Sequence, residues 1–204
     1  GSVALTVTPP EVASIAVFPS AASISKGLTV QYSAISTLTD GNTGDVSPIV
    51  AWDSSDSSVA SISGAGLATG MGLGATSIRA TLDGVSGETS LTVTPPVLAS
   101  IVVTPAPATV ARGLSLQLSA TGVFTDDTAV DHTATSTWDS SNPAVATVDA
   151  TGLVTGVAEG VTNITASVAA ISGSAVLTVT SPEVVSIAVF PASSSVPKGL
   201  TLQY

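Results

Sequence analysis

The sequence predicts an all-β chain built from tandem repeats of 86 residues, and two observations lead to this prediction. The segment Ser14-Ile-Ala-Val-Phe-Pro19 recurs at 100–105 and again at 186–191, 86 residues further along each time. Self-similarity at a fixed period is the mark of a repeat architecture. The apolar residues are mostly Ala, Val, Ile and Leu in short runs separated by Ser, Thr, Gly and Pro, which is typical of short strands and not of long helices.

Two further motifs repeat with the same offset and set the expected domain boundaries. Lys26-Gly-Leu-Thr-Val-Gln-Tyr32 recurs at 112–118 and 198–204, and Trp52-Asp-Ser-Ser55 recurs at 138–141. Residues 11–96 align with 97–182 without a gap. The expected domains are the last strand of a preceding repeat at 1–10, complete repeats at 11–96 and 97–182, and the opening strands of a following repeat at 183–204.

Seven strands are expected in each repeat, and in the first repeat they cover 14–17, 28–34, 50–52, 59–62, 66–69, 76–82 and 90–94. The first strand is a short apolar run that ends before Pro19. The second has apolar residues at every other position from Leu28 to Ala34, and a period of two residues indicates a strand with one buried face. The third is the apolar run that contains Trp52.

The remaining four strands are indicated by turn residues and by alternation. The fourth and fifth flank the turn-forming pair Ser63-Gly64. The sixth alternates inward from Ile78 to Leu82, and the seventh does so with Leu91 and Val93. Turn signals at intervals of about 8–12 residues favour a β-sandwich or a β-barrel.

The joint between the repeats is short and rich in proline. Thr94-Pro95-Pro96 connects the last strand of one repeat to the first strand of the next, expected at 100–103. Proline favours an extended, semi-rigid spacer over a flexible one. We therefore expect an array of such repeats to form a fairly straight rod.

Taken in order, these motifs carry a family resemblance. The run Trp138-Asp-Ser-Ser-Asn-Pro-Ala-Val-Ala-Thr-Val148, followed by Gly152-Leu-Val-Thr-Gly156, resembles the bacterial immunoglobulin-like domain, group 2, of intimin- and invasin-type surface proteins. The first repeat has the equivalent residues at 52–55 and 66–70. The resemblance implies an immunoglobulin-like β-sandwich with a spacer or adhesive role, and it implies no catalytic site.

The charge balance excludes several classes of function. Four Lys and Arg stand against fourteen Asp and Glu, a net charge of −10. A chain this acidic lacks the basic face that nucleic-acid binding needs, and anionic membrane surfaces would repel it. No apolar run approaches the roughly 18 residues of a membrane-spanning helix, and cysteine is absent. Only 9% of residues are charged, so either Ser and Thr solvate the surface or part of it is covered by neighbouring chains.

Two candidate sites contain acidic or basic side chains, and neither is convincing. His132 is the single histidine, and Asp131 precedes it, but Val46 occupies the equivalent position of the first repeat. We interpret His132 as a solvated loop residue. The run from Asp40 to Asp45 resembles the start of a calcium loop, but the glycine needed at the sixth position and a closing glutamate are missing.

Other candidate residues are better explained by structure. Trp52 and Trp138 could stack against sugars, but their matching positions inside apolar runs favour buried core residues. Gly70-Met-Gly-Leu-Gly74 lacks the lysine of a phosphate-binding loop. Asn163-Ile-Thr165 is a formal N-glycosylation sequon, interpreted as a chance occurrence. The sequence therefore predicts no catalytic, cofactor-binding or metal-binding residues, no cofactor and no enzymatic activity.

The predicted function is an extracellular structural repeat region of a bacterial surface protein or adhesin, forming either a stalk or a polymer of packed chains. The alternative is a glycan-binding or accessory module of a secreted or phage protein. The expected partners are neighbouring repeats of the same or adjacent chains, and a host or surface ligand bound through a distal region outside this sequence. No nucleic-acid partner and no membrane insertion are expected. The partial repeats at both ends favour a segment of a longer chain over a complete subunit that exchanges strands.

Overall fold

The computed structural model describes residues 7–182, 186–188 and 198, and within them the chain forms strands and turns without any helix. Consequently, none of the described residues belongs to a helix that could cross a membrane. The strands of the first repeat are β1 (Val12–Phe18), β2 (Ala21–Ser25), β3 (Thr29–Gln31), β4 (Ser33–Leu38), β5 (Thr43–Asp45), β6 (Ala51–Ser54), β7 (Ala60–Ile62), β8 (Leu67–Gly70), β9 (Gly74–Leu82) and β10 (Val85–Thr94). Those of the second are β11 (Leu98–Thr104), β12 (Ala108–Ala111), β13 (Ser115–Gln117), β14 (Ser119–Phe124), β15 (Ala129–Asp131), β16 (Thr137–Ser140), β17 (Ala146–Val148), β18 (Leu153–Gly156), β19 (Gly160–Val168) and β20 (Ile171–Thr180).

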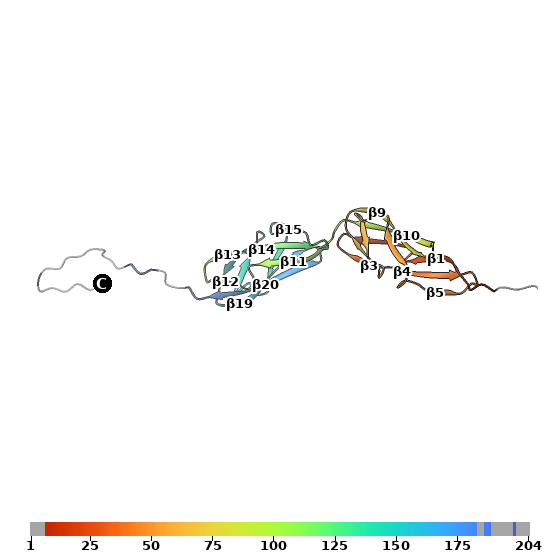
Figure 1. Ribbon diagram of the computed structural model, residues 1–204. Coiled ribbons are helices and arrows are strands. Elements are labelled where there is room, and N and C mark those ends of the chain that lie inside the picture. Colours follow the sequence, from red (N-terminus) through yellow and green to blue (C-terminus); the bar gives the residue numbers. More distant parts are fainter. Residues whose placement is uncertain (1–6, 183–185, 189–197, 199–204) are drawn as a thin grey trace, which may run out of the picture. The chain divides into compact units, whose positions relative to one another are not determined.

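Each repeat is an immunoglobulin-like sandwich of two β layers, as predicted (Figure 1). One layer of the first repeat is the four-stranded sheet β2-β10-β9-β6. The other contains the sheets β1-β4-β5 and β3-β8-β7, and because only Tyr32 separates β3 from β4, these two sheets continue into each other. The second repeat has the same strand order, with β12-β20-β19-β16 as its four-stranded sheet.

The opening strand of each repeat is divided between the two layers. β1 pairs antiparallel with β4, whereas β2 pairs parallel with β10 in the opposite layer. Pro19 and Ser20 lie between them, and proline cannot continue a ladder of hydrogen bonds because it lacks an N–H group. The expected strand at 14–17 is thus the first of two segments, and the second segment was not predicted.

The predicted alternation of buried and exposed residues agrees with the core at most positions and is wrong at one. Tyr32, Ile78 and Leu91 are among the largest fully buried side chains of the first repeat. Leu118, Ile164 and Leu177 hold the equivalent positions in the second. Leu28, predicted to point inward, is 44% exposed, since it lies between the turn at 26–27 and the start of β3 at Thr29.

A glycine in each repeat lets the two layers approach closely. A Cβ atom built on Gly87 of β10 would lie 2.1 Å from the backbone oxygen of Ile15 in β1. On Gly173 of β20 it would lie 2.0 Å from the backbone oxygen of Ile101 in β11. Atoms cannot approach so closely, so glycine is required for β1 and β11 to cross the four-stranded sheets as they do.

The expected strands at the two ends of the chain fall largely outside the described residues. Of the strand expected at 1–10, residues 7–10 are described, and they lie outside any strand. Of the strands expected at 183–204, only residues 186–188 and 198 are described. Both expectations therefore stay predictions.

Candidate functional site

The two tryptophans hold matching structural positions, although neither is fully buried. Trp52 in β6 and Trp138 in β16 donate their Nε1–H to the backbone oxygens of Ser47 (3.1 Å) and Thr133 (3.0 Å). Trp52 packs against the apolar core, and its ring centre lies 6.5 Å from that of Tyr32. The prediction of buried core rings needs correction, because β6 and β16 are edge strands and their rings cover the rim of the core.

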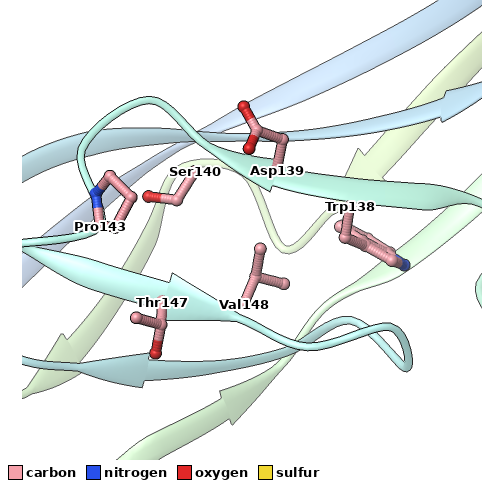
Figure 2. Close-up of a pocket in the computed structure, with 6 residues that line it drawn as sticks. All are labelled: Trp138, Asp139, Ser140, Pro143, Thr147 and Val148. Carbon is pink, nitrogen blue, oxygen red and sulfur yellow. The ribbon is translucent and has the colours of Figure 1, made fainter.

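A shallow hollow beside Trp138 offers little to a ligand. Trp138, Ser140 and Pro143 line it together with Asp139, Thr147 and Val148, and its volume is about 130 Å³ (Figure 2). Ligand pockets usually enclose about 300–1,000 Å³. Gly152 also covers one end of the indole, because a Cβ built there would lie 2.8 Å from Cζ2 of Trp138. This packing favours the structural interpretation of the ring over sugar stacking.

A glutamine and a glycine of the repeated motifs, Gln31 and Gly66 in the first repeat, together form the turn before β8. Gln31 Nε2 donates to the backbone oxygens of Ala65 (2.7 Å) and Tyr32 (2.9 Å). In the second repeat, Gln117 Nε2 donates in the same way to Thr151 and Leu118. Gly66 has a φ of +78°, and a Cβ built there would lie 2.7 Å from the Tyr32 oxygen. The spacing of these residues therefore serves the turn before β8 and not a ligand.

A buried threonine forms hydrogen bonds with the serine hydroxyl groups of the Trp-Asp-Ser-Ser motif. Thr162 Oγ1 accepts the backbone N–H of Asn142 (3.0 Å) and lies 3.0 Å from Ser141 Oγ and 3.2 Å from Ser140 Oγ. Thr76 makes the equivalent contacts in the first repeat. These hydroxyls connect the turn after β16 to β19, which favours a structural role for them.

His132 lies in a turn after β15 and is partly buried, which corrects the prediction of a solvated residue. Its Nδ1 lies 3.0 Å from Thr135 Oγ1, and its backbone oxygen accepts the N–H groups of Thr135 and Ser136. The neighbouring Asp131 carboxylate accepts the backbone N–H of Thr133 (2.8 Å). These bonds close the turn, and a triad would instead need the carboxylate to orient the imidazole.

The acidic loop from Asp40 to Asp45 uses its carboxylates locally. Asp40 accepts the backbone N–H (3.0 Å) and the side-chain amide (2.8 Å) of Asn42. Asp45 accepts the backbone N–H of Ser47 at 2.9 Å. The two carboxylates thus engage different partners, and the described residues contain no cluster of three potential metal-ligating side chains.

A shared turn pattern was not recognised in the sequence. Asp45, Asp56, Asp131 and Asp149 are each followed two residues later by Ser or Thr, whose backbone N–H each of them accepts. The Thr151 hydroxyl, then the backbone N–H groups of Leu153 and Thr151, lower the pKa of Asp149. Hydrogen bonds from Ser58 likewise lower the pKa of Asp56. The signal was present in the sequence as the spacing Asp-x-Ser/Thr.

The outward surface of the four-stranded sheet differs between the repeats. In the second repeat, the central strands β19 and β20 present three pairs that carry no charge. We call these six residues the β19–β20 face: Val161 with Thr178, Asn163 with Val176, and Thr165 with Ser174. The equivalent pair to Thr165 and Ser174 in the first repeat is an exposed ion pair, Arg79 with Glu88, at 3.1 Å.

The sequon also lies on this face. Asn163 is exposed and points outward from β19, while Ile164 is fully buried. The backbone N–H of Asn163 donates to Ser141 Oγ (3.0 Å). The sequon thus lies within a regular paired strand, and its interpretation as a chance match stays a prediction.

Comparison with known proteins decides the family. The sequence model of the bacterial Ig-like domain (group 2) matches residues 11–93 and 97–179, which is most of the chain. The chain belongs to this family. The two matched segments contain the strands β1–β9 and β11–β19 in full and nearly all of β10 and β20. The repeated motif residues, whose hydrogen bonds are described above, lie within these two matched segments.

Among curated proteins, the chain is similar to Ice-binding protein 1 of Shewanella frigidimarina (strain NCIMB 400). The two are 39% identical over 199 residues, which covers 98% of this chain and 22% of the relative. This Ig-like chain therefore spans about a fifth of the relative's length.

The solved structures that resemble this chain are more distant. The S-layer protein rSbsC(31-844) is 20% identical, with a TM-score of 0.43, over 89% of this chain and 30% of that one. Mouse cadherin-23 EC22-24 is 13% identical, with a TM-score of 0.40, over 84% of this chain and 65% of that one.

Proposed function

We propose that this chain is a structural spacer in an extracellular or cell-surface bacterial protein, where tandem Ig-like repeats separate a binding region from its point of attachment. One observation carries the proposal: the motif residues are used for bonds within each sandwich. Gln31 and Gly66 build a turn, Thr76 joins a turn to a strand, and Trp52 closes the rim of the core. A spacer needs such self-contained domains and no catalytic group.

The linker supports the same role. β10 ends at Thr94 and β11 begins at Leu98, so three residues separate the repeats, and two of them are Pro95 and Pro96. Linkers that are short and rich in proline transmit position better than flexible ones. The absence of cysteine also fits a domain whose core, and not a disulfide, holds the two layers together.

Small-angle X-ray scattering of the whole chain tests the spacer. We expect the distance distribution of an elongated particle with the two sandwiches arranged end to end. A variant with glycine at positions 95 and 96 should show a broader distribution with a shorter mean, because glycine linkers behave as flexible coils. A compact particle with the sandwiches side by side, or no effect of the glycines, would contradict the proposal.

The relative named Ice-binding protein 1 favours one second candidate, in which the repeats themselves bind a surface such as ice. Its resemblance extends across 98% of this chain but only 22% of the relative, so most of the relative lies elsewhere. We therefore propose that this chain supports a binding region and does not bind ice. A fluorescently labelled chain should be excluded from slowly growing ice, with the full-length relative as the positive control. Incorporation of the chain into ice would support the second candidate.

A further inference from the structure

The turn after β14 contacts the loop that follows β2. Residues 121–130, which contain this turn, belong to the same compact unit as residues 1–100. Lys26 Nζ lies 3.0 Å from the Asp126 carboxylate, and the Thr125 hydroxyl donates to the backbone oxygen of Lys26 at 2.7 Å. We call Lys26 with Gly27 the Lys26 loop, and Thr125 with Asp126 the Asp126 turn. One ion pair and one hydrogen bond join the two.

The loop and the turn fit closely. The Asp126 side chain is only 6% exposed, and that of Lys26 is 37% exposed. A Cβ built on Gly27 would overlap with the backbone oxygen of Thr125, so the two backbones can approach in this way only at a glycine. The other oxygen of the Asp126 carboxylate accepts the Thr128 hydroxyl at 2.6 Å. This bond, followed by the one from the Lys26 ammonium, lowers the pKa of Asp126 to about 2, so the carboxylate is charged at neutral pH.

Thr125 also connects the Asp126 turn to the linker. Its backbone N–H donates to the Val97 oxygen (2.9 Å), and its Oγ1 accepts the Val97 N–H (3.2 Å). Val97 is the last of the three linker residues. In the first repeat, Thr39 makes the same two bonds to Glu11. These two bonds are thus common to both repeats, and the bond from the Thr125 hydroxyl to Lys26 is made in addition to them.

The sequence repeat provides an internal comparison for each half of this contact. Arg112 and Gly113 are the equivalents of the Lys26 loop, and Asp40 is the equivalent of Asp126. Gly113 has nearly the same φ as Gly27, +82° against +88°, yet a Cβ built on it meets no atom within 4 Å. Arg112 and Asp40 are exposed, whereas Asp126 is half-buried. The loop and the turn therefore keep their conformations without the contact, and the burial of Asp126 results from it.

We propose that the Lys26 loop and the Asp126 turn form a latch that limits bending at the Pro95-Pro96 linker. The proposal rests on the spacer function and deepens it, because it names the side chains that would keep the joint stiff. A partly exposed ion pair contributes little between separate molecules. Here the linker is only three residues long, so the two halves meet at high effective concentration and a weak contact is sufficient.

The distance between two spin labels on the full chain tests the latch. The chain has no cysteine, so S86C and S172C, at exposed positions of the two repeats, each carry one label. Double electron–electron resonance of this chain should give a narrow distance distribution. Adding K26E sets like charges against each other, so the ratio of latched to open joints should fall at least about tenfold and the distribution should broaden.

Matched variants separate the latch from general charge effects. R112E makes the same change of charge in the equivalent loop of the second repeat and should leave the distribution narrow. D126K should broaden the distribution as K26E does, whereas D40K should not. The double variant K26E/D126K exchanges the two charges and should restore the narrow distribution. Where K26E fails to fold, K26Q with R112Q as its control makes the same comparison.

Three outcomes would overturn the latch. A broad distribution in the labelled chain before any charge change would show that the joint is open, and a narrow distribution in K26E would show that the prolines alone hold it. Equal effects of K26E and R112E would point to net charge as the cause. The spacer function fails separately, since a compact particle in small-angle scattering would contradict it whatever K26E does.

Discussion

The fold depends on the absence of a Cβ atom at Gly87 and Gly173. Each lies where the opening strand of its repeat crosses the four-stranded sheet, with a backbone oxygen too close to admit a Cβ atom. Both repeats have glycine at this position, but the sequence alone gives no reason for it, because the crossing brings together residues about 70 positions apart. Tyr32 and Leu118 illustrate the opposite case, since alternation alone identified them as core residues.

Replacing Gly87 with alanine should lower the free energy of unfolding by about 2–4 kcal/mol, because β1 must move away from β10 to admit a methyl group. Chemical denaturation measures this loss. Gly64→Ala is the control, since a Cβ at Gly64 meets no other atom within 4 Å. A loss at Gly64 as large as that at Gly87 would contradict the steric explanation.

Replacing Thr162 with valine should cost about 1–3 kcal/mol of unfolding free energy, because the N–H of Asn142 loses its acceptor inside the protein. Valine has nearly the same shape as threonine, so packing changes little. Thr178→Val, on the outward face of β20, should be close to neutral. Denaturation of both variants decides whether the hydroxyl cluster or general strand propensity stabilises the turn.

At the scale of the strands and turns, the sequence predicted most strands of a repeat but missed β2, β5 and the first half of β10. Alternation identified most of β9 and the second half of β10, because both have one buried face, but residues 85–89 of β10 were not predicted to form a strand. β2 was missed since its residues are small and its partner β10 is distant in sequence. β5 was missed because all three of its residues are exposed and show no alternation. The interpretation of the candidate sites as structural stays a prediction, and the partial exposure of Trp138 depends on its edge strand and could not be predicted.

The Asp-x-Ser/Thr turns should make stability dependent on pH. The pKa values of Asp45, Asp56, Asp131 and Asp149 are lowered in the folded chain, chiefly by hydrogen bonds from the Ser or Thr two residues later. Since an unfolded aspartate has a pKa of about 3.9, the stabilisation is complete above that value and is lost as the pH falls through the folded pKa values. The melting temperature should therefore be level above about pH 5 and fall below about pH 4.

Asp149→Asn should make the acid-induced fall shallower, because one of the carboxylates with a lowered pKa no longer titrates. Asp139→Asn, outside these turns on β16, is the matched control. Melting curves recorded from neutral to acid pH compare the two. An unchanged slope for Asp149→Asn would show that the turns do not cause the acid sensitivity.

At the scale of the whole molecule, the Ig-like repeats should be stable without metal ions. The carboxylates of the Asp40–Asp45 loop bond to Asn42 and Ser47, and the chain has no cysteine to hold a soft metal. Adding EDTA to the chain, or calcium to the EDTA-treated chain, should leave the melting temperature unchanged within error. A fall of several degrees with EDTA that calcium reverses would show that these loops hold a cation.

We expect the parallel pairing of β2 with β10 to influence how a repeat responds to mechanical force. Five residue pairs, from Ala21 with Ser90 to Ser25 with Thr94, join the first and last parts of the domain. A pull on the two ends of the repeat draws these parallel strands past each other, so all their hydrogen bonds are loaded in shear at the same time. Strands that peel apart break one bond after another and yield at lower force. A tether made of such domains would resist the drag of flowing water without a covalent cross-link.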